Sequence, residues 1–442
     1  MDIVDLLREL VEIKTVNDPI KGVKPGKEAA KYIHDTLVDW GLEPEIIESS
    51  GYYSVFGSIG DGRPLVLLMA HFDTVPVDPS RWDYDPFKLT IVGDKGYGRG
   101  ALDDKSNVAA LMLTVRELSR KKLGYKIYYA FTGDEEIGGV NGAAVIAEKL
   151  RSNGSIPKYM INADGVGMKV IIRRRKAFGA VIKVPVLKKK TRGKVCRKTF
   201  KAEYPVAQHS HAAYFIPGVD THPLVSASIF VRETNVLVKS IDGVFLKSNV
   251  IPPEIVLEYI APDDKGDEVE YDEGLTLLLK MIVPLTRMPI PTEKPSEYGV
   301  SITPNVYTIA DGKHSLYLDI RAMLTDKNAI EKELERLKEE LFPEIEYSVR
   351  SGSGGYLYTS RNSLLVKSFL NALRTAKEPS EVMEGAGASD SRYFTILGVE
   401  AVDFGPRGGN IHGDNEYVVI SSLKKLPRIY TMVIEDLVKH ET

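Results

Sequence analysis

The sequence predicts an α/β fold: a mostly parallel β-sheet with helices on both faces, interrupted by an inserted α+β domain. Three observations predict it. Short apolar runs alternate with helical stretches between residues 65 and 162, which is typical of a covered parallel sheet. The same pattern returns after residue 352, with a predicted strand at 401–404 and a helix from about residue 422. The stretch between them differs in charge and composition.

The first part of the chain alternates regularly between predicted helices and strands. Apolar residues recur at helical spacing from Ile3 to Val11 and from Ala29 to Trp40, and Gly41 is a typical stop for the second helix. The continuous apolar runs that follow predict buried strands, and the amphipathic stretches between them predict helices. The predicted strands are 65–69, 126–131 and 159–162, and the predicted helices are 107–118 and 143–150.

The middle of the chain is predicted to be a separate domain. Residues 165–202 contain fourteen Lys and Arg and no acid, whereas residues 261–274 contain seven acids. An amphipathic helix at 330–341, with Thr325 or Asp326 as its cap, precedes a Ser-Gly linker at 351–355. We therefore predict a discontinuous catalytic domain, residues 1–176 and 353–442, and an inserted lid or dimerisation domain, residues 177–352.

Composition narrows the chemistry that the chain can perform. It has 442 residues, one cysteine (Cys196), eight histidines, 61 acids and a net charge of -3. A single cysteine excludes an intramolecular disulfide framework and thiolate-rich metal sites. The near-neutral charge gives no general reason to expect nucleic acid as a partner. The acidic N-terminus, and apolar runs far shorter than the ~20 residues of a membrane span, predict a cytoplasmic protein.

Polar clusters follow the predicted strands and could meet at one crevice. In open α/β sheets, ligands bind beyond the carboxyl ends of the strands. Histidines and carboxylates without cysteine suit divalent ions such as zinc, cobalt or manganese. Taken singly, each cluster also fits a structural hydrogen bond, a solvated acidic patch or a helix cap. The clusters contain His71 and Asp73, Asp103 in a Gly-rich loop, Glu135 and Glu136, Asp164, and His412.

The order of these clusters resembles the co-catalytic zinc metallopeptidase family. That family includes aminoacylase, acetylornithine deacetylase, succinyl-diaminopimelate desuccinylase, glutamate carboxypeptidase and carnosinase. The resemblance covers nearly the whole main domain and implies the di-zinc exopeptidase type of fold. The motifs that carry it are HFDTVP at 71–76, GRGALDDK at 98–105, DEEIG at 134–138, Asp164 and His412.

The resemblance implies a role for each of these residues. Asp103 would bridge two divalent metal ions, most simply zinc. Asp73 would orient His71, and Glu135 would be the general base, since a base cannot also be a ligand. The peptide bond between Asp103 and Asp104 would be cis. His71 and Asp164 would complete one metal, and Glu136 and His412 the other.

Further residues resemble the substrate-binding positions of the family. Arg392, in the segment GASDSR, would grip a substrate carboxylate, unless it forms a structural ion pair with Asp390. His211 resembles the lid histidine, often supplied by the partner subunit, that stabilises the oxyanion. Asn305 resembles a lid asparagine with a similar role. His209 and His222 lie close enough in sequence to be alternatives to His211, and the resemblance implies a homodimer formed through the inserted domain.

Two readings of the substrate remain open within this family. The leading one is a deacylase that cleaves the amide bond of small N-acyl amino acids by a metal-activated water. The alternative is a dipeptidase, aminopeptidase or carboxypeptidase. Asp164, in place of glutamate, resembles the peptidase branch, whereas the Ser-Asp-Ser-Arg segment resembles the deacylases. A peptidase that binds a free ammonium would also need an acid, for which Asp104 is a candidate.

Two readings outside this chemistry are weaker. A nucleic-acid or anionic-surface binder could use the basic stretch 169–201, but aromatic residues are sparse there and a charge run is usually a solvated face. A metal-free pseudoenzyme is disfavoured because every expected ligand and the base are present.

Overall fold

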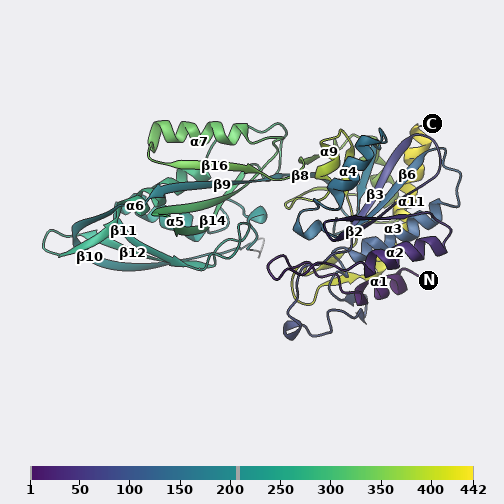
Figure 1. Cartoon of the computed structure of the whole chain (residues 1–442), viewed down its shortest axis with the longest axis horizontal. Helices are drawn as coiled ribbons and strands as arrows, with labels where there is room; N and C mark the ends of the chain where they lie inside the picture. Colours follow the sequence, from purple (N-terminus) through teal and green to yellow (C-terminus); the bar gives the residue numbers. More distant parts are fainter. Residues whose placement is uncertain (1, 206–209, 442) are drawn as a thin grey trace. The chain divides into compact units, whose positions relative to one another are not determined.

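The chain forms two compact units. The computed structural model describes residues 2–205 and 210–441. Unit 1 comprises Met1–Arg174 and Ser353–Thr442, and unit 2 comprises Arg175–Gly352 (Figure 1). No described helix has the length and apolar character of a membrane span.

Unit 1 is built on a nine-stranded sheet with the strand order β1-β2-β6-β3-β7-β19-β8-β17, in which β18 also pairs with β8. The four central strands β6, β3, β7 and β19 run parallel, which confirms the predicted mostly parallel sheet. Antiparallel neighbours extend it on both sides. The strands are β1 Glu45–Ser49, β2 Tyr52–Ile59, β3 Pro64–His71, β6 Lys126–Thr132, β7 Tyr159–Asn162, β8 Val170–Arg174, β17 Leu357–Tyr358, β18 Val382–Gly385 and β19 Glu400–Asp403.

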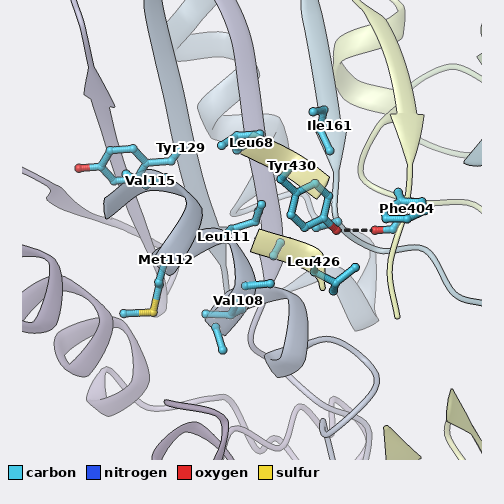
Figure 2. Close-up of a cluster of buried hydrophobic side chains, with 14 of the residues drawn as sticks. Leu68, Val108, Leu111, Met112, Val115, Tyr129, Ile161, Phe404, Leu426 and Tyr430 are labelled. Atoms are coloured by element: carbon cyan, nitrogen blue, oxygen red, sulfur yellow. Dashed lines mark hydrogen bonds between the residues drawn. The ribbon is translucent and has the colours of Figure 1, made fainter. Parts of the chain in front are cut away.

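Helices cover both faces of this sheet because successive side chains of a strand point to opposite faces. Leu68 of β3 belongs to the core that also contains Val108 and Leu111 of α3 (Figure 2). Its neighbour Met69 belongs to a second core with Ile146 of α4. The first core includes α1 Ile3–Glu12, α2 Glu28–Asp39, α3 Lys105–Leu118, α8 Leu364–Thr375 and α11 Leu426–Glu441, and the second includes α4 Ala143–Ser152 and α9 Arg392–Thr395 (Figure 1).

A small four-stranded sheet in unit 1 joins segments that are far apart in the sequence. Its order is β20-β21-β5-β4, so the segment after residue 408 pairs with the segment before the Gly-rich loop. The polar clusters of residues 98–105 and 410–416 follow or precede these strands directly. The strands are β4 Thr90–Val92, β5 Lys95–Tyr97, β20 Gly408–Gly409 and β21 Tyr417–Val419.

Unit 2 contains two further four-stranded sheets around one apolar core. Their orders are β14-β15-β9-β16 and β11-β12-β10-β13, and helices α5, α6 and α7 contribute to the same core. The elements are β9 Lys176–Pro185, β10 Lys188–Lys201, α5 Pro223–Thr234, β11 Leu237–Gly243, β12 Glu254–Pro262, β13 Asp267–Asp272, α6 Glu273–Thr286, β14 Ser301–Ala310, β15 Lys313–Ala322, α7 Asn328–Leu341 and β16 Glu346–Ser351.

The basic and acidic stretches of unit 2 are partners in one sheet. The basic strand β10 lies between β12 and β13 and runs antiparallel to both. Opposite charges on neighbouring strands stabilise such a sheet. The basic stretch therefore has an internal partner, which argues against the reading as a nucleic-acid binder. The ion pairs are Lys188–Asp272, Lys189–Glu273, Lys190–Glu268, Arg197–Glu258 and Lys201–Glu254.

Two predicted details of helix ends were wrong. Helix α7 begins at Asn328, so its N-cap is Lys327 rather than Thr325 or Asp326. The side chain of Asp326 still accepts the N–H of Asn328, at 2.9 Å, because that N–H has no acceptor within the helix. The predicted C-terminal helix is two helices, α10 Ile420–Leu423 and α11 Leu426–Glu441.

Candidate metal centre

The parallel strands deliver three of the candidate residues to one edge of the sheet. Strand β3 ends at His71, β6 is followed by Glu135, and β7 is followed by Asp164. Because β6, β3 and β7 are adjacent and parallel, their carboxyl ends lie together. His71, Glu135 and Asp164 form one group whose ligand atoms all lie within 4.8 Å of one another.

A second group of potential ligands lies beside the first, and Asp103 touches both. Asp103, Glu136 and His412 also have ligand atoms within 4.8 Å of one another. Asp103 Oδ1 lies 3.0 Å from His71 Nε2, and Asp103 Oδ2 lies 2.9 Å from His412 Nε2. His412 Nε2 lies 3.0 Å from Glu136 Oε2. The structure thus brings together all five residues expected to be ligands, with Asp103 between the two histidines.

Asp73 organises the residues around it through its carboxylate. The backbone N–H of Glu135 donates to Asp73 Oδ1 at 3.0 Å, and that of Glu136 donates to Oδ2 at 3.2 Å. His71 Nδ1 lies 3.1 Å from the carbonyl oxygen of Asp73 and 3.4 Å from its Oδ1. Both are acceptors, so with a metal bound the proton would stay on Nδ1 and leave the lone pair of Nε2 for the metal.

One supporting residue carries no motif that sequence reasoning could have found. Asn17 is 2% exposed, and its Nδ2 donates to Asp73 Oδ2 at 3.0 Å. Its position is set by a backbone pairing in which the N–H of Asn17 donates to the carbonyl of Thr74 at 2.8 Å. Asn17 lies 56 residues before Asp73, and only the folded chain brings the two together.

We expect Asp73→Asn to weaken metal binding by roughly 10- to 100-fold, which is the usual cost of losing an outer partner of a ligand. An amide offers one acceptor oxygen, whereas Asp73 receives N–H groups on both oxygens. Chelator competition on the purified variant would measure the loss. Asn17→Ala removes only the bond from Asn17 Nδ2 to Asp73 and should weaken metal binding less. Unchanged metal affinity in Asp73→Asn would contradict this role.

The electrostatics of the site fit a cationic occupant. Burial raises the pKa of Asp164 well above its ordinary value, and the charge of Glu135 raises it further. Burial, followed by the charge of Asp103, raises the pKa of Glu136 to about 7. Burial lowers the pKa of His412, but hydrogen bonds to Asp103 and Glu136 outweigh it and raise that pKa to about 11. Crowded carboxylates of this kind favour any bound positive charge, and their donor set of imidazole and carboxylate suits zinc, cobalt or manganese.

The two aspartates that follow the Gly-rich loop have different environments. The Asp103–Asp104 peptide bond is cis, as the resemblance implies. Asp104 is 1% exposed; its Oδ2 accepts the backbone N–H of His71 at 3.2 Å and its Oδ1 accepts from Asn107 Nδ2 at 2.6 Å. Asp104 therefore fixes the strand end rather than facing a ligand.

Arg392 lies beside the metal centre. Its side chain is 13% exposed, and its Nη2 donates to the carbonyl of Gly138 at 2.6 Å. Its ion pair with Asp390, at 3.6 Å, is longer than a hydrogen bond. Burial raises the pKa of Glu135, and the charges of His71 and Arg392 oppose that shift.

The residues expected to act from the inserted domain all lie in unit 2. His211 Nδ1 accepts the N–H of Ala213 at 3.0 Å, and its Nε2 lies 3.1 Å from Asn249 Nδ2. Asn305 is buried, and its Nδ2 donates to the carbonyl of Ser248 at 2.7 Å. Ser248, Asn249, Arg321 and Arg350 contribute to a pocket of about 410 Å³.

Of the two histidines that are alternatives to His211, His222 caps a helix. His222 is 2% exposed, and its Nδ1 accepts the N–H of Leu224, which makes it the cap of α5. Burial lowers its pKa to about 3. His209 lies outside the described residues.

One group of histidine and carboxylate side chains lies at the carboxyl ends of parallel strands, and a second group lies beside it; together they could hold two metal ions, which is the kind of site that metal-dependent hydrolases use. The sequence profile of Peptidase family M20/M25/M40 matches residues 67–436, and the chain belongs to this family. The match confirms the resemblance and the enzyme class predicted from the motifs.

Known proteins similar to this chain cover nearly its whole length. The succinyl-diaminopimelate desuccinylase of Bordetella avium is 23% identical over 445 residues, which cover 98% of both chains. The structure of aminoacylhistidine dipeptidase from Vibrio alginolyticus is 17% identical, with a TM-score of 0.69 over 98% of this chain and 96% of that one. A dinuclear metal-binding peptidase from Bacillus subtilis is 12% identical, with a TM-score of 0.56 over 99% and 98%. The two structures show the same α/β fold.

Proposed function

We propose that the chain is a deacylase that hydrolyses the amide bond of small N-acyl amino acids, like acetylornithine deacetylase and succinyl-diaminopimelate desuccinylase. The observation that carries this proposal is the position of Asp103, whose two oxygens face His71 and His412, one each. Asp103 would bridge two divalent ions, zinc or else cobalt or manganese. His71 and Asp164 would hold one ion, and Glu136 and His412 the other. The similarity to a desuccinylase over almost the whole chain supports this choice of substrate.

The chain's own residues supply the proton transfer. Two divalent ions bound in this site would acidify a water and polarise the amide carbonyl. Glu135 takes the proton of the attacking water on its carboxylate and delivers it to the nitrogen of the leaving amine. Burial raises the pKa of Glu135 above its ordinary value, which favours the protonated form that the transfer passes through.

Substrate recognition is assigned to three residues. Arg392 binds the substrate carboxylate through its planar guanidinium, which suits a carboxylate better than a lysine would. His211 stabilises the oxyanion through its imidazole ring. Asn305 supports the same oxyanion. A homodimer formed through residues 177–352 and a cytoplasmic location stay predictions of the sequence.

The environment of Asp104 favours the deacylase over an aminopeptidase. An aminopeptidase or dipeptidase needs an acid for the free ammonium of its substrate. Asp104, the candidate for that role, is 1% exposed, and both of its oxygens already accept hydrogen bonds. A deacylase needs no such acid, because the nitrogen of its substrate is acylated.

We expect the zinc- or cobalt-loaded protein to release amine from N-acyl amino acids and to leave simple dipeptides largely intact. The panel should contain acetyl-ornithine, succinyl-diaminopimelate, other N-acyl amino acids and dipeptides, with free amine measured over time. Glu135→Gln is the matched control for contaminating activity. Cleavage restricted to substrates with a free ammonium next to the scissile bond would contradict the deacylase and select the peptidase alternative.

A further inference from the structure

Arg99 and Glu416 form a buried ion pair that belongs to neither group of ligands. Arg99 is 3% exposed and Glu416 is 0% exposed, and Arg99 Nη1 donates to Glu416 Oε2. Strand β5 ends at Tyr97 and β21 begins at Tyr417, and these two residues are paired across the small sheet. The N–H of Gly98 therefore reaches the carbonyl of Glu416, at 3.1 Å. The sheet thus places Arg99 and Glu416 opposite each other where two loops diverge.

The carboxylate of Glu416 binds the backbone of the loop that carries Asp103. Its Oε1 accepts the N–H of Leu102 at 2.8 Å and the N–H of Asp103 at 3.0 Å, and its Oε2 accepts that of Gly100 at 3.3 Å. Helix α3 begins only at Lys105, so these N–H groups precede the helix and have no acceptor within it. A buried N–H without a partner is unfavourable, so Glu416 fixes the path of this loop.

The guanidinium of Arg99 binds the backbone of the loop that carries His412. Its Nη2 donates to the carbonyl of Gly413 at 3.0 Å, and its other face lies over the ring of Trp82, with 5.3 Å to the centroid. The side chain of His412 is 50% exposed, and its backbone is in the left-handed region with φ +58°. Packing alone therefore does not hold His412, and the bond from Arg99 to Gly413 is one of the contacts that fix this loop.

We propose that Arg99 and Glu416 are positioning residues that hold Asp103 and His412 at a fixed spacing, so that the metal site containing both is formed before a metal binds. The two side chains act as one unit, because each binds the other and one ligand-bearing loop. This proposal rests on the proposed function, since it takes Asp103 and His412 to be ligands of the same ion.

The test compares Arg99→Lys and Glu416→Gln with the wild-type chain. A lysine replaces the two guanidinium nitrogens that bind Glu416 and Gly413 with one nitrogen atom and so loses the planar fork, and the amide of a glutamine replaces one acceptor oxygen with a donor. We expect the ion assigned to Asp103 and His412 to bind roughly 10- to 100-fold less tightly in both variants, measured by chelator competition. The cobalt absorption spectrum should change, and kcat should fall more than KM rises.

Glu378→Gln is the matched control. Glu378 is likewise buried and paired, with Arg407 and Lys425, and neither partner is a proposed metal ligand. It should lower the melting temperature of the metal-free protein without changing metal affinity or the cobalt spectrum. Arg99→Lys keeps the charge beside Glu416 and decides the matter if Glu416→Gln does not fold.

Three outcomes separate the hypotheses. Wild-type metal affinity and cobalt spectra in Arg99→Lys would overturn the positioning role, as would an equal loss of metal affinity in Glu378→Gln. A wild-type chain that binds two ions, cleaves N-acyl amino acids and is weakened only by the Arg99 and Glu416 variants supports it. A wild-type chain that binds fewer than two ions, or cleaves no amide, overturns the proposed function itself, whatever the variants do.

Discussion

Glu135→Gln is expected to bind two metal ions as the wild-type chain does and to lose roughly 10²- to 10⁴-fold in kcat, the usual contribution of a positioned general base. A glutamine keeps the shape of the side chain but cannot accept the proton of the attacking water. The backbone N–H of residue 135 would still donate to Asp73, so the local structure should be retained. Steady-state kinetics and elemental analysis of the same preparation would measure both quantities.

This experiment also decides between two roles for Glu135. The ligand atoms of Glu135, His71 and Asp164 all lie within 4.8 Å of one another, so the geometry alone also allows Glu135 to be a metal ligand. Glu136→Gln is the matched control, because Glu136 follows directly and lies 3.0 Å from His412. We expect metal loss in Glu136→Gln and none in Glu135→Gln. Loss of metal from Glu135→Gln, or substantial activity in that variant, would rule out the general-base role.

Asp103→Asn is expected to reduce the metal content from two ions per chain to one or fewer. Its effect on activity should exceed the ~10- to 100-fold typical of an outer partner, because it removes a shared ligand. The amide nitrogen of an asparagine is a donor and cannot ligate a cation. Each carboxylate oxygen of Asp103 faces a histidine, so the substitution removes one of the two contacts whichever oxygen is replaced. Elemental analysis and cobalt titration would count the ions.

The control for Asp103→Asn is again Glu378→Gln, which removes a buried carboxylate from an ion pair with Arg407 and Lys425. It should retain both ions. Two tightly bound ions in Asp103→Asn would contradict a bridging role, and a wild-type chain with reproducibly one ion would do the same.

Much of the architecture of unit 1 could be predicted because its signals are local. The apolar run 65–69 is the buried centre of β3, and 107–118 lies within α3, because buried parallel strands and amphipathic helices have different apolar patterns. Helix ends were less predictable. Helix α7 begins two residues after Asp326, since the cap depends on which backbone conformation the packed helix adopts. The cross-strand pairs of β10 with β12 and β13 could be suspected from opposite charges, but their register could not be derived.

The sequence by itself determined the chemistry available to this protein: histidines and carboxylates in clusters near buried strands, with only one cysteine in the chain. Residue type and order along the chain carry that information. Only the tertiary structure decided where neighbouring side chains lie. Asp103 faces both histidines, while Asp104 turns into the strand end. Adjacent residues differ because the backbone sends their side chains in different directions.

The contribution of Glu416 was likewise invisible in the sequence. It contacts the Gly-rich loop across more than three hundred residues, through backbone N–H groups that every residue type possesses. Such contacts depend on which loops the sheets bring together and leave no trace in local composition.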